Sequence, residues 1–260
     1  MIKLNKEAVC LIMHLWYEET SISLIEKISQ VWDGEVHVSL IKDAPNNECI
    51  LKNLHRYFKE VHVYELEENF GNDQVGFINT FRQIKKWQPW VFYVHDKHPS
   101  KRIWLDDLVD PIIENPELIN DLINKEEVGI ISSKKMKMKV SYHDLKDTVM
   151  QDYLFVFQDA AYINISILKK FTSMWIKSLI EIFNILENKN KNLTKEKEFD
   201  FSFTAGNIFA IRSEIVYRTH RCVHQEYWNK SYQKDGTVFH GLERFYYYAS
   251  ERLGKQNKFI

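Results

Sequence analysis

Charged and polar side chains that could bind a phosphate or a metal ion follow one hydrophobic run of the sequence. The run at residues 90–94 leads into His95, Asp96 and Lys97. A lysine and a histidine can stabilise the negative charge of a diphosphate, whereas a carboxylate can hold Mg²⁺ or Mn²⁺. Asp96 is thus the candidate metal ligand, although His98 stands where a second carboxylate would complete the usual pair. The alternative is that His95 and His98 only cap the end of a strand.

A second polar cluster lies in a turn that precedes this strand by one helix. Gly71 permits a positive φ or the close approach of a ligand to the backbone. Asn69 and Asp73 flank it, and their side chains can bind a ribose, base or sugar hydroxyl. Asp73 could equally cap the helix that follows, and the two roles are compatible.

Two carboxylates late in the chain, Asp235 and Glu243, are candidates for a general base. Glu243 could instead form a structural ion pair with Arg244. Gly206 and Asn207 lie in a short polar interruption of a hydrophobic stretch. There the backbone could approach a ligand and Asn207 could bind a sugar hydroxyl, or both residues could simply form a turn.

Hydrophobic periodicity predicts the elements that position these residues. Continuous or alternating apolar runs predict strands, and 3.6-residue spacing predicts helices. The predicted order is strand 8–16, helix 18–32, strand 35–41, helix 50–58, strand 61–66, helix 77–87 and strand 90–95. This alternation is typical of a mostly parallel α/β sheet with helices on both faces. Ligands bind beyond the carboxyl ends of such strands, so we expect the two polar clusters to line one crevice.

The pattern becomes less regular after Pro99. It predicts helices at 104–113 and from 116, a strand at 128–131, a loop or edge strand at 132–139, a long amphipathic helix at 167–186, an exposed linker at 188–198, a strand at 199–211 and a closing helix at 241–253. We expect one domain over residues 1–260, with a regular half at 1–98 and a less regular half at 99–260.

Composition narrows the class of protein. A net charge of -1 argues against binding the phosphates of nucleic acids. The three cysteines have neither disulfide nor zinc-site spacing, which favours a cytoplasmic location. No run approaches the ~20 apolar residues of a membrane span, so any membrane contact is expected to be peripheral, at the inner face.

Four short motifs occur in the order found in the rhamnan synthesis protein F family. They are residues 68–73 with Phe77, residues 95–97, residues 203–212 and residues 240–244. From about Val9 to Leu253 the chain resembles these glycosyltransferases of bacterial cell-surface polysaccharides. It departs from the family at Asn72, which replaces an arginine, and at Asp96, which replaces a threonine.

The resemblance implies a GT-A-like fold and the transfer of a sugar, with inversion, onto a bacterial surface glycan. It also implies that residues 1–98 form a nucleotide-binding half and residues 99–260 an acceptor-side half. The implied donor is dTDP-L-rhamnose or a UDP-hexose, and the acceptor is a glycan that could be lipid-linked. Asn69, Gly71, Asp73, His95, Lys97, Gly206 and Asn207 would bind the donor, with Glu243 or Asp235 as the base. The alternatives are a noncatalytic nucleotide-sugar or glycan-binding module, and a metal-dependent hydrolase that uses His95, Asp96 and His98.

Overall fold

The computed structural model describes residues 2–67, 72–140, 201–220 and 238–260. In this part of the chain the strands are β1 (Val9–His14), β2 (Val36–Ile41), β3 (Val61–Leu66), β4 (Trp90–His95), β5 (Val128–Ser132), β6 (Lys137–Val140), β7 (Phe201–Thr204), β8 (Phe209–Arg212) and β9 (Gln256–Phe259). The helices are α1 (Glu18–Ser29), α2 (Asn47–Tyr57), α3 (Asn72–Gln83), η1 (Pro99–Lys101), α4 (Arg102–Glu114), α5 (Pro116–Ile123), α8 (Ser213–His220) and α9 (Val238–Arg252).

Seven strands form one mixed sheet in the order β3-β2-β1-β4-β8-β5-β9, and β6 pairs with β7 in a second, two-stranded sheet. The strands β3, β2, β1 and β4 are parallel to one another. Strand β8 runs antiparallel to both of its neighbours, β4 and β5. The predicted α/β class and mostly parallel sheet are therefore confirmed, and the architecture is compatible with a Rossmann-like fold.

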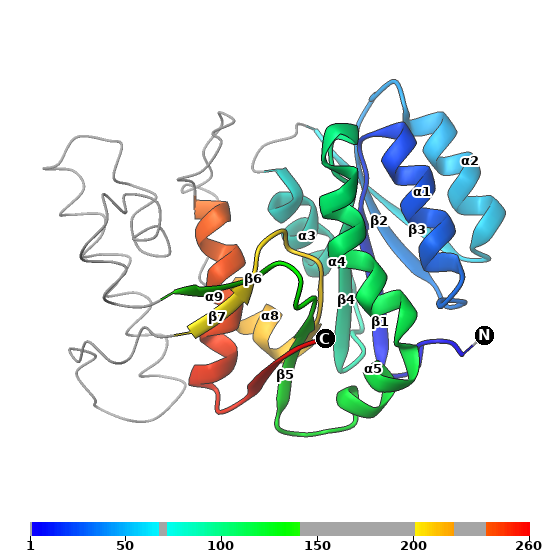
Figure 1. Cartoon of the computed structure of the whole chain (residues 1–260). Coiled ribbons are helices and arrows are strands. Elements are labelled where there is room, and N and C mark those ends of the chain that lie inside the picture. The colour runs from blue at the N-terminus through cyan, green and yellow to red at the C-terminus, as the bar shows by residue number, and fades with distance from the viewer. Residues whose placement is uncertain (1, 68–71, 141–200, 221–237) are drawn as a thin grey trace, which may run out of the picture.

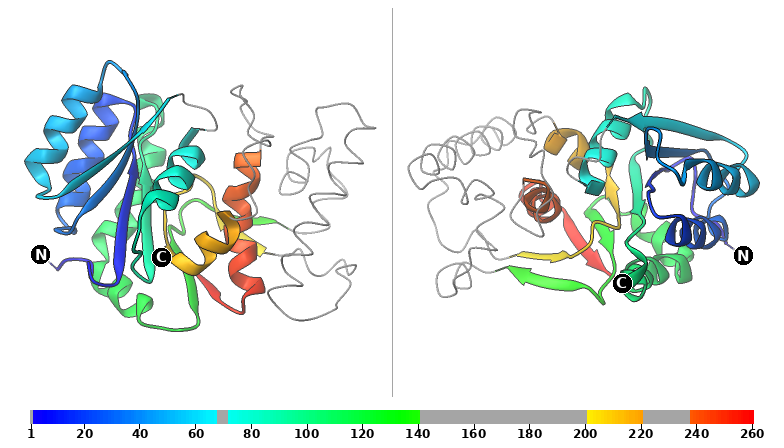
Figure 2. Two further views of the ribbon diagram at one scale, coloured as in Figure 1. Left: turned by 180° about the vertical axis from the view of Figure 1, so that it is seen from behind. Right: turned by 90° about the horizontal axis from the view of Figure 1, so that it is seen from above.

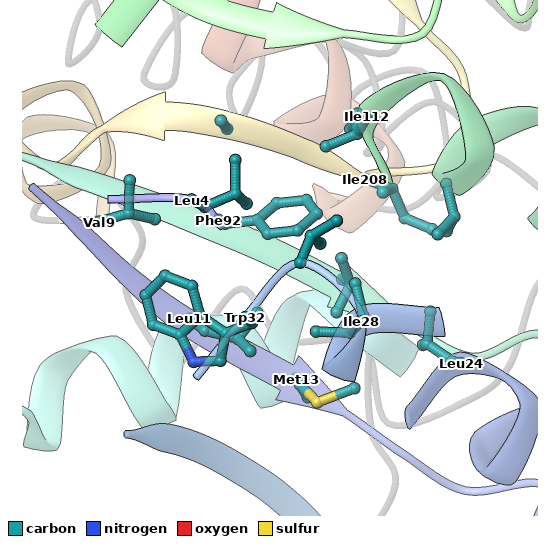
Figure 3. Close-up of a cluster of buried hydrophobic side chains, with 14 of the residues drawn as sticks. Leu4, Val9, Leu11, Met13, Leu24, Ile28, Trp32, Phe92, Ile112 and Ile208 are labelled. Carbon is teal, nitrogen blue, oxygen red and sulfur yellow. The ribbon is translucent and has the colours of Figure 1, made fainter. Parts of the chain in front are cut away.

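Helices cover both faces of the sheet (Figures 1 and 2). On one face α1, α2, α4 and α5 pack on alternate side chains of the strands, among them Leu11, Met13 and Phe92 (Figure 3). On the other face α3, α8 and α9 pack on the intervening side chains, among them Ile12 and Tyr93. Because β1 and β4 are buried on both faces, their sequences read as continuous apolar runs.

Several predicted elements differ from the structure. The strand expected at 199–211 is two strands, β7 and β8, separated by a turn at residues 205–208. Ser23 and Glu26, which have the spacing of a capping box, lie inside α1 because the helix begins at Glu18. Helix α8 and strand β9 were not predicted. The amphipathic helix expected at 167–186 and the linker at 188–198 lie outside the described residues.

Within the described ranges, every helix is too short or too polar to cross a membrane.

Candidate functional site

The candidate site lies at the carboxyl edge of the sheet, where the strand order reverses. Strand β1 has β2 on one side and β4 on the other, so the connections that follow β1 and β4 leave in opposite directions. The last residues of the two strands, His14 and His95, are paired in register. Such a reversal opens a ligand-binding crevice in many α/β proteins.

Asp73, in the first turn of α3, connects this edge to the turn before β8. Its carboxylate Oδ2 accepts a 2.8 Å hydrogen bond from Asn207 Nδ2 and lies 3.6 Å from His95 Nε2. Its backbone oxygen accepts a 2.7 Å hydrogen bond from the hydroxyl of Tyr93. Asp73 therefore does more than begin a helix, because its side chain joins α3 to the end of β4 at His95 and to the turn at Asn207.

His95 and Lys97 bring nitrogen atoms to the same place. His95 Nδ1 lies 2.8 Å from the backbone oxygen of Asp96, and Nε2 lies 2.7 Å from the backbone oxygen of Gly206. Lys97 Nζ lies 3.4 Å from His95 Nε2 and 4.8 Å from the centre of the Trp104 ring, a cation–π distance. Since each ring nitrogen faces an oxygen acceptor, this geometry can also accommodate a protonated His95.

Two consecutive residues with positive φ shape the turn between β7 and β8. Gly206 has φ 114° and Asn207 has φ 55°. A Cβ atom on Gly206 would lie 2.4 Å from Cδ1 of Leu108, so the position needs glycine for space as well as for conformation. The Gly206 amide donates a hydrogen bond to Oε1 of Glu243 in α9. Glu243, which is 8% exposed, thus holds the turn against the site.

Asp96 faces a different part of the structure from the other residues of the motif. Its Oδ2 accepts hydrogen bonds from the amides of Trp16 and Tyr17, at 2.8 and 2.5 Å, and from the Ser21 hydroxyl at 2.7 Å. These donors belong to the start of α1, whose positive dipole end favours a carboxylate. Asp96 therefore caps α1 from 80 residues away in sequence, and Oδ2 is already saturated with donors.

Burial and neighbouring charges set the ionisation of the site. Burial, helped by Lys97, lowers the pKa of His95 to about 4. Burial also lowers the pKa of Lys97, although Asp73 and Glu243 oppose the effect. Burial alone would raise the pKa of Asp73, but His95 and Lys97 outweigh it and hold that pKa below its usual value. At neutral pH the site thus contains an anionic Asp73 and a neutral His95.

Two residues that the motifs did not identify as functional, His14 and Trp104, belong to this edge. His14 is buried beside Asp73 and His95, its Nδ1 lies 2.9 Å from Ser39 Oγ, and burial lowers its pKa to about 4. Trp104 Nε1 is buried without a hydrogen-bond partner among the described residues, as is Oδ1 of Asn207, which the motifs did identify. Orphaned buried polar atoms are uncommon, and a ligand is one explanation for them. The end of the first apolar run at His14 was the only advance signal of the two new residues.

The predicted site residues divide into three groups. Asp73, His95, Lys97, Gly206, Asn207 and Glu243 come together at the carboxyl edge. Asp96 faces α1, and His98 caps η1 by accepting a hydrogen bond from the Ser100 amide, so these two do not join the cluster. Asn69, Gly71 and Asp235 lie outside the described residues, as do the side chains of Asn72 and Arg244.

Comparisons of the chain with protein-family models, characterised proteins and solved structures gave no match.

Proposed function

We propose that the protein is a glycosyltransferase that moves a sugar from a nucleotide-sugar donor to a bacterial surface glycan. The observation that carries the proposal is the convergence of Asp73, His95, Lys97, Asn207 and Glu243 at the reversal of strand order. These residues come from four separate segments of the chain. Simple capping of strands and helices would not require them to meet.

In this proposal the donor's diphosphate would bind beside Lys97. An arriving anion would raise the pKa values of Lys97 and His95, which burial lowers, and would thereby favour their protonated forms. The carbonyl oxygens at both nitrogens of His95 suit the protonated ring. Orphaned polar atoms of Trp104 and Asn207 supply a further donor and acceptor nearby. The departing diphosphate would thus be stabilised by fixed protein charges.

Asp96 could offer a Mg²⁺ or Mn²⁺ ion only its Oδ1, because three donors from the start of α1 already occupy its Oδ2. The proposed reaction therefore relies on Lys97 and His95 to neutralise the leaving group. Metal dependence stays a prediction of the sequence, and no step of the proposal depends on it.

Glu243 is the proposed general base. Inverting transfer needs a carboxylate that takes the acceptor's proton while the anomeric carbon is attacked from the opposite side. The Gly206 amide fixes the orientation of the Glu243 carboxylate. Asp235, the other predicted base, lies outside the described residues.

The finer parts of the proposal come from the resemblance to the rhamnan synthesis protein F family. They are the GT-A type of fold, dTDP-L-rhamnose or a UDP-hexose as the donor, a lipid-linked or other surface glycan as the acceptor, and a cytoplasmic location with peripheral membrane contact. The four parallel strands, with the polar cluster at their carboxyl edge, support the GT-A type of fold.

The direct test is to incubate the protein with a panel of dTDP- and UDP-sugars and to measure the release of nucleoside diphosphate. We expect release from at least one donor, and a loss of at least ~100-fold in Glu243→Gln. Lys85→Met, which changes an exposed lysine at the end of the α3 segment, is the matched control and should keep the wild-type rate.

Two other outcomes would reject the proposal. Tight nucleotide binding without release from any donor would favour the noncatalytic binding module. Phosphatase activity that a chelator abolishes would favour the metal-dependent hydrolase.

A further inference from the structure

A second cluster of ionisable side chains lies at the amino ends of β2 and β3, the opposite edge of the sheet from the candidate transferase site. Glu35 and Glu60 immediately precede the two strands, and His37 and His62 are the second residues of the strands. The two histidines are paired in register, and the amide of Val36 donates to the backbone oxygen of Glu60. Parallel pairing therefore brings two carboxylates and two imidazoles together.

The distances within this cluster match those between the ligands of a tetrahedral metal ion. His62 Nε2 lies 3.2 Å from Glu35 Oε2 and 3.3 Å from Glu60 Oε1. Zinc binds nitrogen and carboxylate oxygen at roughly 2.0–2.2 Å, which places neighbouring ligand atoms of a tetrahedron roughly 3.3–3.6 Å apart. Ligand atoms of Glu35, Glu60 and His62 all lie within 4.8 Å of one another. Little rearrangement would be needed to close these three side chains around one ion.

His37 lies beside these three ligands without joining them. Its Nε2 lies 3.9 Å from Glu35 Oε1, and its ring is stacked on that of His62, with centroids 4.9 Å apart. An imidazole lone pair lies in the plane of its ring, so two stacked rings do not both point at one ion. The other nitrogen, Nδ1, lies 2.9 Å from the Tyr64 hydroxyl. His37 therefore packs against His62 and supports the orientation of that ring.

We propose that Glu35, Glu60 and His62 form a site for Zn²⁺ or a similar first-row divalent metal that links β2 to the edge strand β3. Imidazole and carboxylate ligands suit these metals, and three protein ligands would leave the fourth position of a tetrahedron to water. The site is separate from the proposed donor site, so the bound metal would stabilise the fold and would not take part in sugar transfer.

The test is a calorimetric titration of the tag-free protein with Zn²⁺, together with a Co²⁺ titration followed by visible absorption. We expect one ion per chain and the intense Co²⁺ bands of a tetrahedral site. His62→Gln should weaken Zn²⁺ binding at least ~100-fold. His55→Gln, an exposed histidine on α2, is the matched control and should bind Zn²⁺ like the wild type.

A stability readout keeps the proposal falsifiable if His62→Gln folds poorly. Glu60→Gln changes an exposed residue and should also lose binding. A Zn²⁺ concentration ~100-fold above Kd should raise the Tm of the wild type by roughly 5–10 °C, but should not raise that of Glu60→Gln. Wild-type binding no tighter than millimolar, or Glu60→Gln and His62→Gln variants that bind Zn²⁺ as the wild type does, would overturn the proposal.

Discussion

Replacement of Asp96 by alanine should destabilise the fold, because its carboxylate holds the start of α1. The substitution leaves three hydrogen-bond donors, the amides of Trp16 and Tyr17 and the hydroxyl of Ser21, without their acceptor. Each buried donor left unpaired costs ~1–3 kcal/mol. Since Trp16 and Tyr17 are only partly buried, we expect a total loss of about 3–5 kcal/mol in the free energy of unfolding.

Asp96→Asn is the matched variant, because it keeps the shape of the side chain and a carbonyl oxygen that can accept two hydrogen bonds. Burial raises the pKa of Asp96 to about 6 in spite of its three hydrogen bonds. That shift corresponds to roughly 3 kcal/mol against the ionised form. A neutral amide avoids this penalty. The gain offsets the weaker hydrogen bonds that the amide makes with the donors of α1. We therefore expect Asp96→Asn to lie within ~1 kcal/mol of the wild type at pH 7.

Urea denaturation followed by tryptophan fluorescence measures both variants. We expect the wild type and Asp96→Asn to have similar free energies of unfolding and Asp96→Ala to have a much lower one. If the free energy of unfolding of Asp96→Ala lies within ~1 kcal/mol of the wild-type value, the capping role is wrong. A stable Asp96→Ala protein that has lost Mg²⁺- or Mn²⁺-dependent transfer would restore Asp96 as a metal ligand.

Three further predictions concern the carboxyl edge. Gly206→Ala should lower the free energy of unfolding by ~2 kcal/mol or more in urea denaturation, because alanine resists the positive φ and its Cβ atom has no space; an unchanged midpoint would contradict the observed turn. Lys97→Met should weaken UDP or dTDP binding by roughly 10–100-fold in calorimetry, the scale of a charge-assisted hydrogen bond. If the Lys97→Met protein binds either nucleotide with wild-type affinity, Lys97 does not belong to the site. Between pH 7 and pH 5 the free energy of unfolding should fall by at least ~2 kcal/mol. The unfolded chain takes up protons at His14 and His95 from pH 6.5 downward, whereas the folded chain resists to about pH 4, and buried His220 adds to this loss. Proton uptake by folded Asp96 near pH 6 offsets only part of it. Equal or greater stability at pH 5 would contradict these burial effects.

The sequence predicted the first half of the fold well, because its strands are buried and their apolar runs are uninterrupted. The predicted bounds of β3 and β4, residues 61–66 and 90–95, are those observed. The meeting of Asp73 with His95 also followed from the sequence, since the carboxyl ends of parallel strands share one edge of the sheet.

The second half was harder to predict because its structure depends on contacts between distant segments. Residues 199–211 alternate as one strand, and the break at Gly206 and Asn207 arises from a positive φ at both positions and from the close packing of Leu108. The role of Asp96 depends on α1 lying beside the end of β4. No pattern local to residues 95–97 could have revealed that arrangement.

The central proposal is that Lys97 and His95 bind the diphosphate of a nucleotide sugar at the carboxyl edge of β1 and β4, beside Asp73 and Asn207. A crystal structure of the protein with UDP or dTDP tests it most directly. We predict that the diphosphate lies within hydrogen-bond distance of Lys97 Nζ and next to the turn at Gly206. A nucleotide bound elsewhere on the protein, with Lys97 and Asn207 out of contact, would contradict the proposed site.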